Sequence, residues 1–126
     1  MTSLGPWTVE AVDAEDIRTL AGVLADPNPI HLDPAAVREL GMGDRLINQG
    51  PANLAYIYNM LSEARPDAIV ASLKVRFLSN VREGDRVVAA GEVVSGEGDV
   101  IECRVWLDVE GGERALEGLA HLQPQG

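Results

Sequence analysis

Two side chains suited to proton transfer stand close together in the segment Asp26-Pro27-Asn28-Pro29-Ile30-His31-Leu32-Asp33. Aspartate and histidine, here Asp26 and His31, are residue types that often act as general acids and bases near neutral pH. Each proline fixes its own φ and biases the residue before it towards extended backbone, so the segment is a poor helix and a stiff loop. Such a loop holds catalytic groups in fixed geometry, which makes this segment the first candidate for an active site.

Each of these residues also has a purely structural interpretation. Asp26 can close a preceding helix or form an Asx turn, and a single histidine is commonly structural. Asp33 stands directly before Pro34, where a helix N-cap is expected, so we assign Asp33 a capping role. The combination of Asp26, Asn28 and His31 between two prolines favours the chemical interpretation for the acid and the imidazole.

Length and charge argue against several classes of protein. The chain has 126 residues, which suits a single domain over residues 1–126. A formal net charge of −10 disfavours nucleic acids and anionic membranes as partners, because both require clustered lysine and arginine. No apolar run approaches the ~20 residues of a membrane helix. The N-terminal residues lack the pattern of a signal peptide, so we expect a cytoplasmic protein.

The residue types that hold metals are scarce. One cysteine, Cys103, and two histidines, His31 and His121, give neither an internal disulfide nor a cluster of ligands with known spacing. We therefore predict no metal and no redox cofactor. Cys103 is expected to be a small core residue, as are Tyr56 and Tyr58, whereas His121 has no polar neighbours in its strand and receives no role.

The first half of the chain predicts one strand and three helices. A strand over residues 5–12 is followed by a helix that Asp13 caps, with apolar residues at helical spacing as far as Leu24. A short second helix covers residues 34–41. The third helix, residues 50–64, is apolar almost all round, which predicts burial on most of its sides.

The second half alternates with the period of β-strands. Strands are predicted over residues 69–77, 86–95, 100–109 and 114–123, joined by turns at 84–85, 96–98 and 111–112. In the first of these strands we expect one dry face, made of Ile69, Ala71, Leu73, Val75 and Phe77. A buried helix followed by an antiparallel meander predicts an α+β fold in which a curved sheet wraps around that helix.

The loop segment also resembles a known motif. Residues 25–33 are similar to Gly-Asp-x-Asn-Pro-apolar-His-x-Asp, the motif of the MaoC-like (R)-specific enoyl-CoA hydratases, with Ala25 in place of the glycine. The similarity extends over about residues 12–94, through Gln49-Gly50 at a helix start, the strand 73–77 and the turn 84–85. The resemblance implies the hot-dog fold.

The same resemblance implies a hydro-lyase acting on 2-enoyl or 3-hydroxyacyl thioesters of coenzyme A or acyl carrier protein. Asp26 and His31 would hold the water that adds to the double bond, and Asn28 would support them. The backbone N–H of Gly50, at the start of the third helix, would stabilise the enolate-like oxygen. Gln49 stands where many relatives have histidine, and Pro51 is uncommon after the glycine, which suggests an unusual substrate or partner subunit.

Several alternatives stay open at this point. The same site could add an amine to an enoyl thioester, or the chain could be a hot-dog thioesterase or one subunit of a heteromeric hydratase. Hot-dog chains usually pair, so we expect a homodimer, or a heterodimer with another hot-dog chain. Four basic residues either meet the phosphates of coenzyme A or an acidic carrier protein, or are solvated strand positions: Lys74, Arg76, Arg82 and Arg86.

Overall fold

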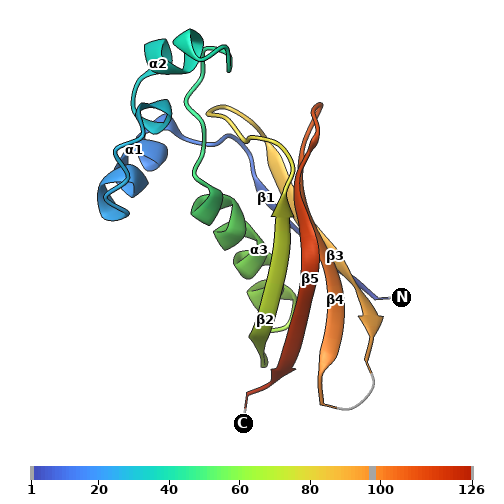
Figure 1. Ribbon diagram of the computed structural model, residues 1–126. Coiled ribbons are helices and arrows are strands. Elements are labelled where there is room, and N and C mark those ends of the chain that lie inside the picture. Colours follow the sequence, from blue (N-terminus) through green and yellow to red (C-terminus); the bar gives the residue numbers. More distant parts are fainter. Residues whose placement is uncertain (1, 97–98, 126) are drawn as a thin grey trace.

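The computed structural model, which describes residues 2–96 and 99–125, is a curved five-stranded antiparallel sheet with one long helix on its inner face (Figure 1). The spatial order of the strands is β1-β3-β4-β5-β2. Their bounds are Ser3–Val9 (β1), Ala68–Phe77 (β2), Val87–Ser95 (β3), Ile101–Val109 (β4) and Arg114–Pro124 (β5). The α+β prediction and the hot-dog fold are confirmed. The predicted turn at 96–98 falls partly on residues 97–98, which lie outside the described residues.

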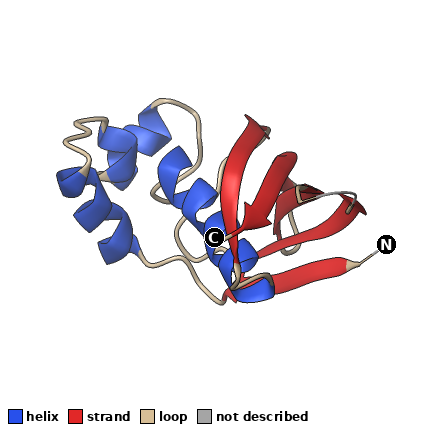
Figure 2. Ribbon diagram, turned by 90° about the horizontal axis from the view of Figure 1, so that it is seen from below, coloured by secondary structure: helices blue, strands red, loops and turns tan. Residues whose placement is uncertain are grey.

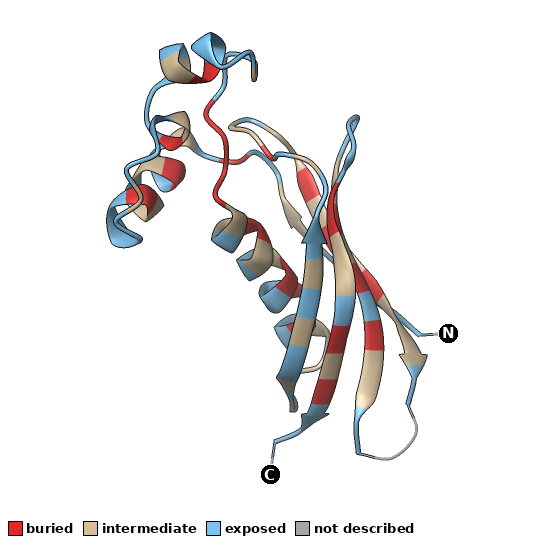
Figure 3. Ribbon diagram, viewed as in Figure 1, coloured by how far each residue is buried: buried red, intermediate tan, exposed pale blue. Residues whose placement is uncertain are grey.

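Helix α3 (Gly50–Ala64) is the helix that the sheet encloses. Pro51 suits its first turn, and the helix ends at Ala64 because Pro66 disfavours helical backbone at the residue before it, Arg65. A stripe formed by Asn53, Ile57, Met60 and Leu61 is buried against the sheet. The prediction of burial on most sides was too broad, because several positions of α3 are exposed (Figure 3). Tyr58 is one of them: it was predicted to be a core residue but is 42 % exposed, beside β2.

The inner face of the sheet supplies the other half of the core. On β4, Cys103, Val105 and Leu107 are fully buried, while Arg104 and Trp106 between them point to the opposite face. The core placement of Cys103 is confirmed, and its burial raises the pKa of the thiol.

Strand β2 departs from the predicted alternation. Its pairing with β5 shifts register between Val70 and Ser72, which places an extra residue at Ala71. Val70 therefore packs against the core together with Leu73 and Val75, whereas Ile69 is exposed. The expected dry face was wrong for Ile69 and Ala71, because a bulge reverses the phase of every residue before it. It was also wrong for Phe77, the last residue of the strand, which is 56 % exposed.

Three short helices form a separate layer beyond one end of the sheet (Figures 1 and 2). They are α1 (Ala14–Val23), the 3₁₀ turn η1 (Pro29–His31) and α2 (Pro34–Glu39). Side-chain caps begin them: Asp13 accepts from the Glu15 N–H at 3.1 Å, and Asp33 accepts from the Ala35 N–H at 2.9 Å. The capping roles predicted for Asp13 and Asp33 are confirmed.

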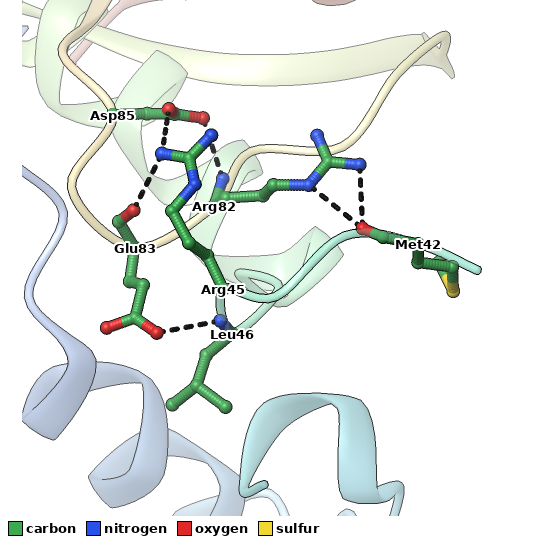
Figure 4. A network of polar contacts seen from close by, with 6 residues as sticks. All are labelled: Met42, Arg45, Leu46, Arg82, Glu83 and Asp85. Atoms are coloured by element: carbon green, nitrogen blue, oxygen red, sulfur yellow. Dashed lines mark hydrogen bonds and ion pairs between the residues drawn. The ribbon is translucent and has the colours of Figure 1, made fainter. Parts of the chain in front are cut away.

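A network of polar contacts fastens this layer to the sheet (Figure 4). The Asp85 carboxylate accepts from the Arg45 guanidinium at 2.8 Å and from the Arg82 backbone N–H at 2.9 Å. The Glu83 carboxylate accepts from the Leu46 N–H at 2.9 Å, and the Arg82 guanidinium donates to the Met42 carbonyl. We call these six residues the clamp. It holds the segment before α3 against the turn at residues 82–85, where Gly84 has a φ of +85°.

No helix among residues 2–96 and 99–125 is long and apolar enough to span a membrane.

The clamp generates a stability prediction. Asp85→Ala removes a carboxylate that is only 11 % exposed and leaves the Arg45 guanidinium and the Arg82 N–H without this acceptor. We therefore expect a loss of about 1.5–3 kcal/mol in the free energy of unfolding, measured by urea denaturation. Asp108→Ala is the matched control, because Asp108 pairs with Arg114 at a side-chain exposure of 43 % and should cost about 1 kcal/mol at most. Equal losses in both variants would contradict the role given to the clamp.

Candidate active site

The end of α1 sets the position of Asp26. The Asp26 N–H donates to the Ala21 carbonyl at 2.9 Å, and the Ala25 N–H donates to the Gly22 carbonyl at 3.2 Å, which together form a Schellman motif. This motif requires left-handed backbone at Ala25, whose φ is +51°. Glycine suits that conformation better than alanine, so the departure of Ala25 from the motif leaves the turn in place at some cost.

Asp26 combines both interpretations drawn from the sequence. Its Oδ1 accepts the Asn28 N–H at 3.1 Å, which is the predicted Asx turn, while Oδ2 faces the imidazole of His31. Asn28, two residues further on, forms a second Asx turn: its Oδ1 accepts the Ile30 N–H at 3.2 Å and caps η1. Asn28 thus supports the loop through the backbone.

His31 is 7 % exposed, and its ring is held from one side. Nδ1 lies 2.6 Å from the carbonyl oxygen of Ile47. A carbonyl only accepts, so Nδ1 carries a proton, and Nε2 is left facing Asp26 Oδ2 at 3.3 Å. The ring orientation and the tautomer are therefore both fixed by one backbone contact.

This geometry creates a site for a water molecule or a shared proton. When His31 is neutral, the Nε2 lone pair and a carboxylate oxygen of Asp26 are two acceptors that repel each other unless a donor satisfies them. A water that donates one O–H to each atom does so. The Asp26 side chain is 35 % exposed, so solvent reaches the pair, and either group can take a proton from that water.

The start of α3 is linked to this pair through Ile47, which contacts His31 and stands three residues before Gly50. Gly50 is the first residue of the helix, so its N–H has no acceptor within the helix. A Cβ added at Gly50 would stand 3.5 Å from the ring of Phe77, the last residue of β2. Pro51 has no N–H, which leaves Gly50 as the candidate donor at this position. Its surroundings are compatible with the oxyanion role predicted for it.

Gln49 lies outside the acid–base pair. Its side chain is 1 % exposed, and Nε2 donates to the Ile17 carbonyl at 2.8 Å, which ties α1 to the start of α3. Its Oε1 is buried with no hydrogen-bond partner among the described residues. The contact with Ile17 links Gln49 to α1 (Ala14–Val23), the helix that leads into the loop of Asp26.

Sequence reasoning missed a buried amide cluster beside the site. Asn48 Nδ2 donates to Asn53 Oδ1 at 2.9 Å and to the Tyr56 hydroxyl at 3.1 Å. The Tyr56 ring lies 5.7 Å from that of Trp7, and burial raises the pKa of its hydroxyl. The cluster borders a cavity of about 370 Å³ between α1, α3 and β1. The available signal was Asn53, an amide in the middle of an apolar helix.

Other basic and imidazole groups are engaged elsewhere. Arg82 donates to Met42 within the clamp, and Arg86 pairs with Glu10 and Glu110. Both guanidinium groups, which were considered as contacts for phosphate, thus already have partners within the chain. The hydrogen bond to Glu10 raises the pKa of Arg86.

The prediction that His121 lacks polar neighbours was wrong. Ser72 lies 3.0 Å from its Nδ1 and Glu102 lies 3.1 Å from its Nε2. These neighbours belong to adjacent strands, which a reading along one strand does not reveal.

Within the described part of the chain, no group of three or more His, Cys, Asp or Glu side chains is placed to hold a metal ion.

Comparisons with known proteins place this site in context. The model of the MaoC like domain family matches residues 6–107. A mitochondrial 3-hydroxyacyl-[acyl-carrier-protein] dehydratase of Arabidopsis thaliana is 30% identical over 82 residues, which is 65% of this chain but only 49% of that protein.

Two solved structures share the fold at low identity. An (R)-hydratase from A. caviae involved in PHA biosynthesis superposes with a TM-score of 0.85 at 22% identity, over 99% of this chain and 98% of that one. A chain of the ChsH1–ChsH2 complex from Mycobacterium tuberculosis superposes with a TM-score of 0.86 at 16% identity, over 98% and 96%.

The backbone at Ala25 generates a prediction. Ala25→Gly should raise the free energy of unfolding by about 1 kcal/mol, because it relieves left-handed alanine without changing a side-chain contact. Gly41 is the matched control: it occupies the same position after α2 with a φ of +70°, so Gly41→Ala should lower stability by a similar amount. Thermal or urea unfolding measures both, and a destabilised Ala25→Gly variant would contradict the assignment.

Proposed function

Because the chain belongs to the MaoC-like domain family, we propose that it is a hydro-lyase that adds water to a 2-enoyl thioester, or removes it from a 3-hydroxyacyl thioester. The observation that carries the proposal is the 3.3 Å approach of Asp26 Oδ2 to His31 Nε2, with Nδ1 held by Ile47. The dehydratase relative and the hydratase with the same fold support the choice of reaction.

In the proposed reaction the pair binds one water through Oδ2 and Nε2. The water oxygen forms a bond to C3 of the enoyl thioester while one of its protons passes to the pair. The electron pair of the C2–C3 double bond moves towards the thioester carbonyl, and the pair then returns a proton to C2. The product carries the hydroxyl on C3 and one more hydrogen on C2, and dehydration is the reverse.

The backbone N–H of Gly50 is assigned the role of donor to the carbonyl oxygen of the thioester. Negative charge develops on that oxygen as the enolate forms, and a backbone N–H at a helix N-terminus stabilises it. The absence of a Cβ lets the substrate approach the backbone beside Phe77.

We also propose that the chain pairs through β2. This strand is at the edge of the sheet, so one row of its backbone groups lacks a neighbouring strand within the chain. Beside it, Tyr58 and Ile69 are exposed and line one hollow between α3 and β2. A second hot-dog chain placed there would extend the sheet and cover both side chains.

The proposed activity is tested within the loop itself. Asp26→Asn and His31→Ala should each lower turnover on a 2-enoyl thioester by about 10²–10⁴-fold, and the double variant should lose little more, because both groups act on one water. Asp33→Ala is the control from the same loop: it should cost about 0.5–2 kcal/mol of stability through the lost cap and keep its turnover. Near-normal turnover of Asp26→Asn, or an inactive but folded Asp33→Ala, would refute these roles.

The proposed pairing is tested by mass measurement during gel filtration. The wild-type chain should elute as a dimer, and Tyr58→Glu combined with Ile69→Lys should shift it towards monomer. Val23→Lys is the control, because Val23 is an exposed apolar residue on α1, away from β2. A monomeric wild type, or a dimer that is indifferent to the double substitution, would contradict the pairing.

A further inference from the structure

The sheet face turned away from α3 gathers basic side chains. Along β2, β4 and β5 the residues opposite the core include Lys74, Arg76, Arg104 and Arg114, which line one hollow of about 450 Å³. We call these four residues the basic band. Only ten lysine and arginine residues occur in the chain, against twenty aspartate and glutamate residues, and four of the ten line this hollow with Glu117 as its acidic lining residue. The lining of the hollow thus carries four cations and one carboxylate in a chain of net charge −10, and two of the cations also pair with carboxylates outside the lining, Asp108 and Glu92.

Two of the arginines are held in place by side chains of the same sheet. Arg114 donates to Asp108 at 2.8 Å, and its guanidinium lies 5.1 Å from the ring centroid of Trp106. Arg104 donates to Glu92 at 3.2 Å and stays 59 % exposed. Guanidinium groups have five N–H donors, so each retains several for a ligand. Groups that are already ordered lose less conformational entropy when they bind.

An apolar side chain lies in the middle of this charge. Leu119 on β5 is in register with Lys74 on β2 and with Arg104 on β4, so the three form one row across the strands. Leu119 is 43 % exposed. An apolar centre between two cations matches a surface that presents carboxylates around apolar residues, which is the kind of surface an acidic protein partner offers.

At the end of β2 the band comes close to Gly50, the candidate oxyanion donor at the start of α3. Arg76 directly precedes Phe77, and the Phe77 ring lies 3.5 Å from the position a Cβ would take at Gly50. Neighbouring residues of a strand point to opposite faces, so Arg76 marks the outer face at the place where Phe77 marks the inner one. A flexible arm attached to a partner on the band would pass this end of the strand to reach Gly50.

We propose that the basic band is the docking surface for an acidic acyl carrier protein, which presents its thioester arm to the site around the end of β2. The inference rests on the proposed function for the identity of the arm, and on charge complementarity and position for the surface. It separates two forms of substrate. A thioester on a carrier protein would use the band, whereas a thioester on free pantetheine would not.

Direct binding tests this surface independently of catalysis. The probe is a purified acyl carrier protein bearing a fluorescent label and a 2-butenoyl group, titrated with the protein and followed by anisotropy. Lys74→Glu combined with Arg104→Glu should weaken binding at least tenfold and should make it less sensitive to salt. Lys74→Gln with Arg104→Gln should weaken it less. Arg38→Glu, an exposed charge reversal on α2, is the matched control and should bind within twofold of wild type.

Turnover with two substrates separates this inference from the proposed function. For the Glu variant, kcat/KM on the carrier-bound substrate should fall at least tenfold, while kcat/KM on 2-butenoyl pantetheine should stay within twofold, with Tm showing that the variant is folded. Carrier binding that ignores the band, or an equal loss with both substrates, overturns the docking surface. Band-dependent binding by a protein that hydrates neither substrate supports the docking surface and refutes the hydro-lyase proposal.

Discussion

The geometry of the candidate site depends on one hydrogen bond, from Nδ1 of His31 to the carbonyl oxygen of Ile47 at 2.6 Å. It fixes which imidazole nitrogen is free and directs that nitrogen at Asp26. In a second hydrogen bond Ile47 is the donor: its N–H donates to the Ile30 carbonyl at 3.0 Å. These two bonds join η1 to the segment before α3, so the imidazole is positioned by the backbone that leads into the central helix.

Ile47 must itself be held for that arrangement to persist. The clamp fastens the flanking residues to the turn at 82–85, and Asn48 donates from its backbone to the Val81 carbonyl at 2.7 Å. Gln49 binds α1 from the other side. The layer of short helices buries few apolar residues of its own, so hydrogen bonds at defined positions, more than core packing, place Asp26 and His31 relative to Gly50.

The sequence predicted the parts that follow from local chemistry. Prolines, caps and periodicity placed α2, α3 and the later strands, and the loop motif brought Asp26 and His31 within 3.3 Å of each other. What it did not predict depends on contacts between distant segments. The bulge at Ala71, the Ser72 and Glu102 neighbours of His121, and the Asn48 amide cluster all arise from strand register or from packing of one element on another. A pattern within one element carries no information on these contacts.

If Asp26 and His31 add water to an enoyl thioester, oxygen from the solvent must appear on C3 of the product, and isotope incorporation measures this. The wild-type protein is incubated with 2-butenoyl coenzyme A in ¹⁸O-labelled water, and the products are identified by mass spectrometry. We expect 3-hydroxybutanoyl coenzyme A with the heavy oxygen in the C3 hydroxyl and the thioester intact. No labelled hydroxyacyl thioester, or free coenzyme A with the label in a released carboxylate, would contradict it.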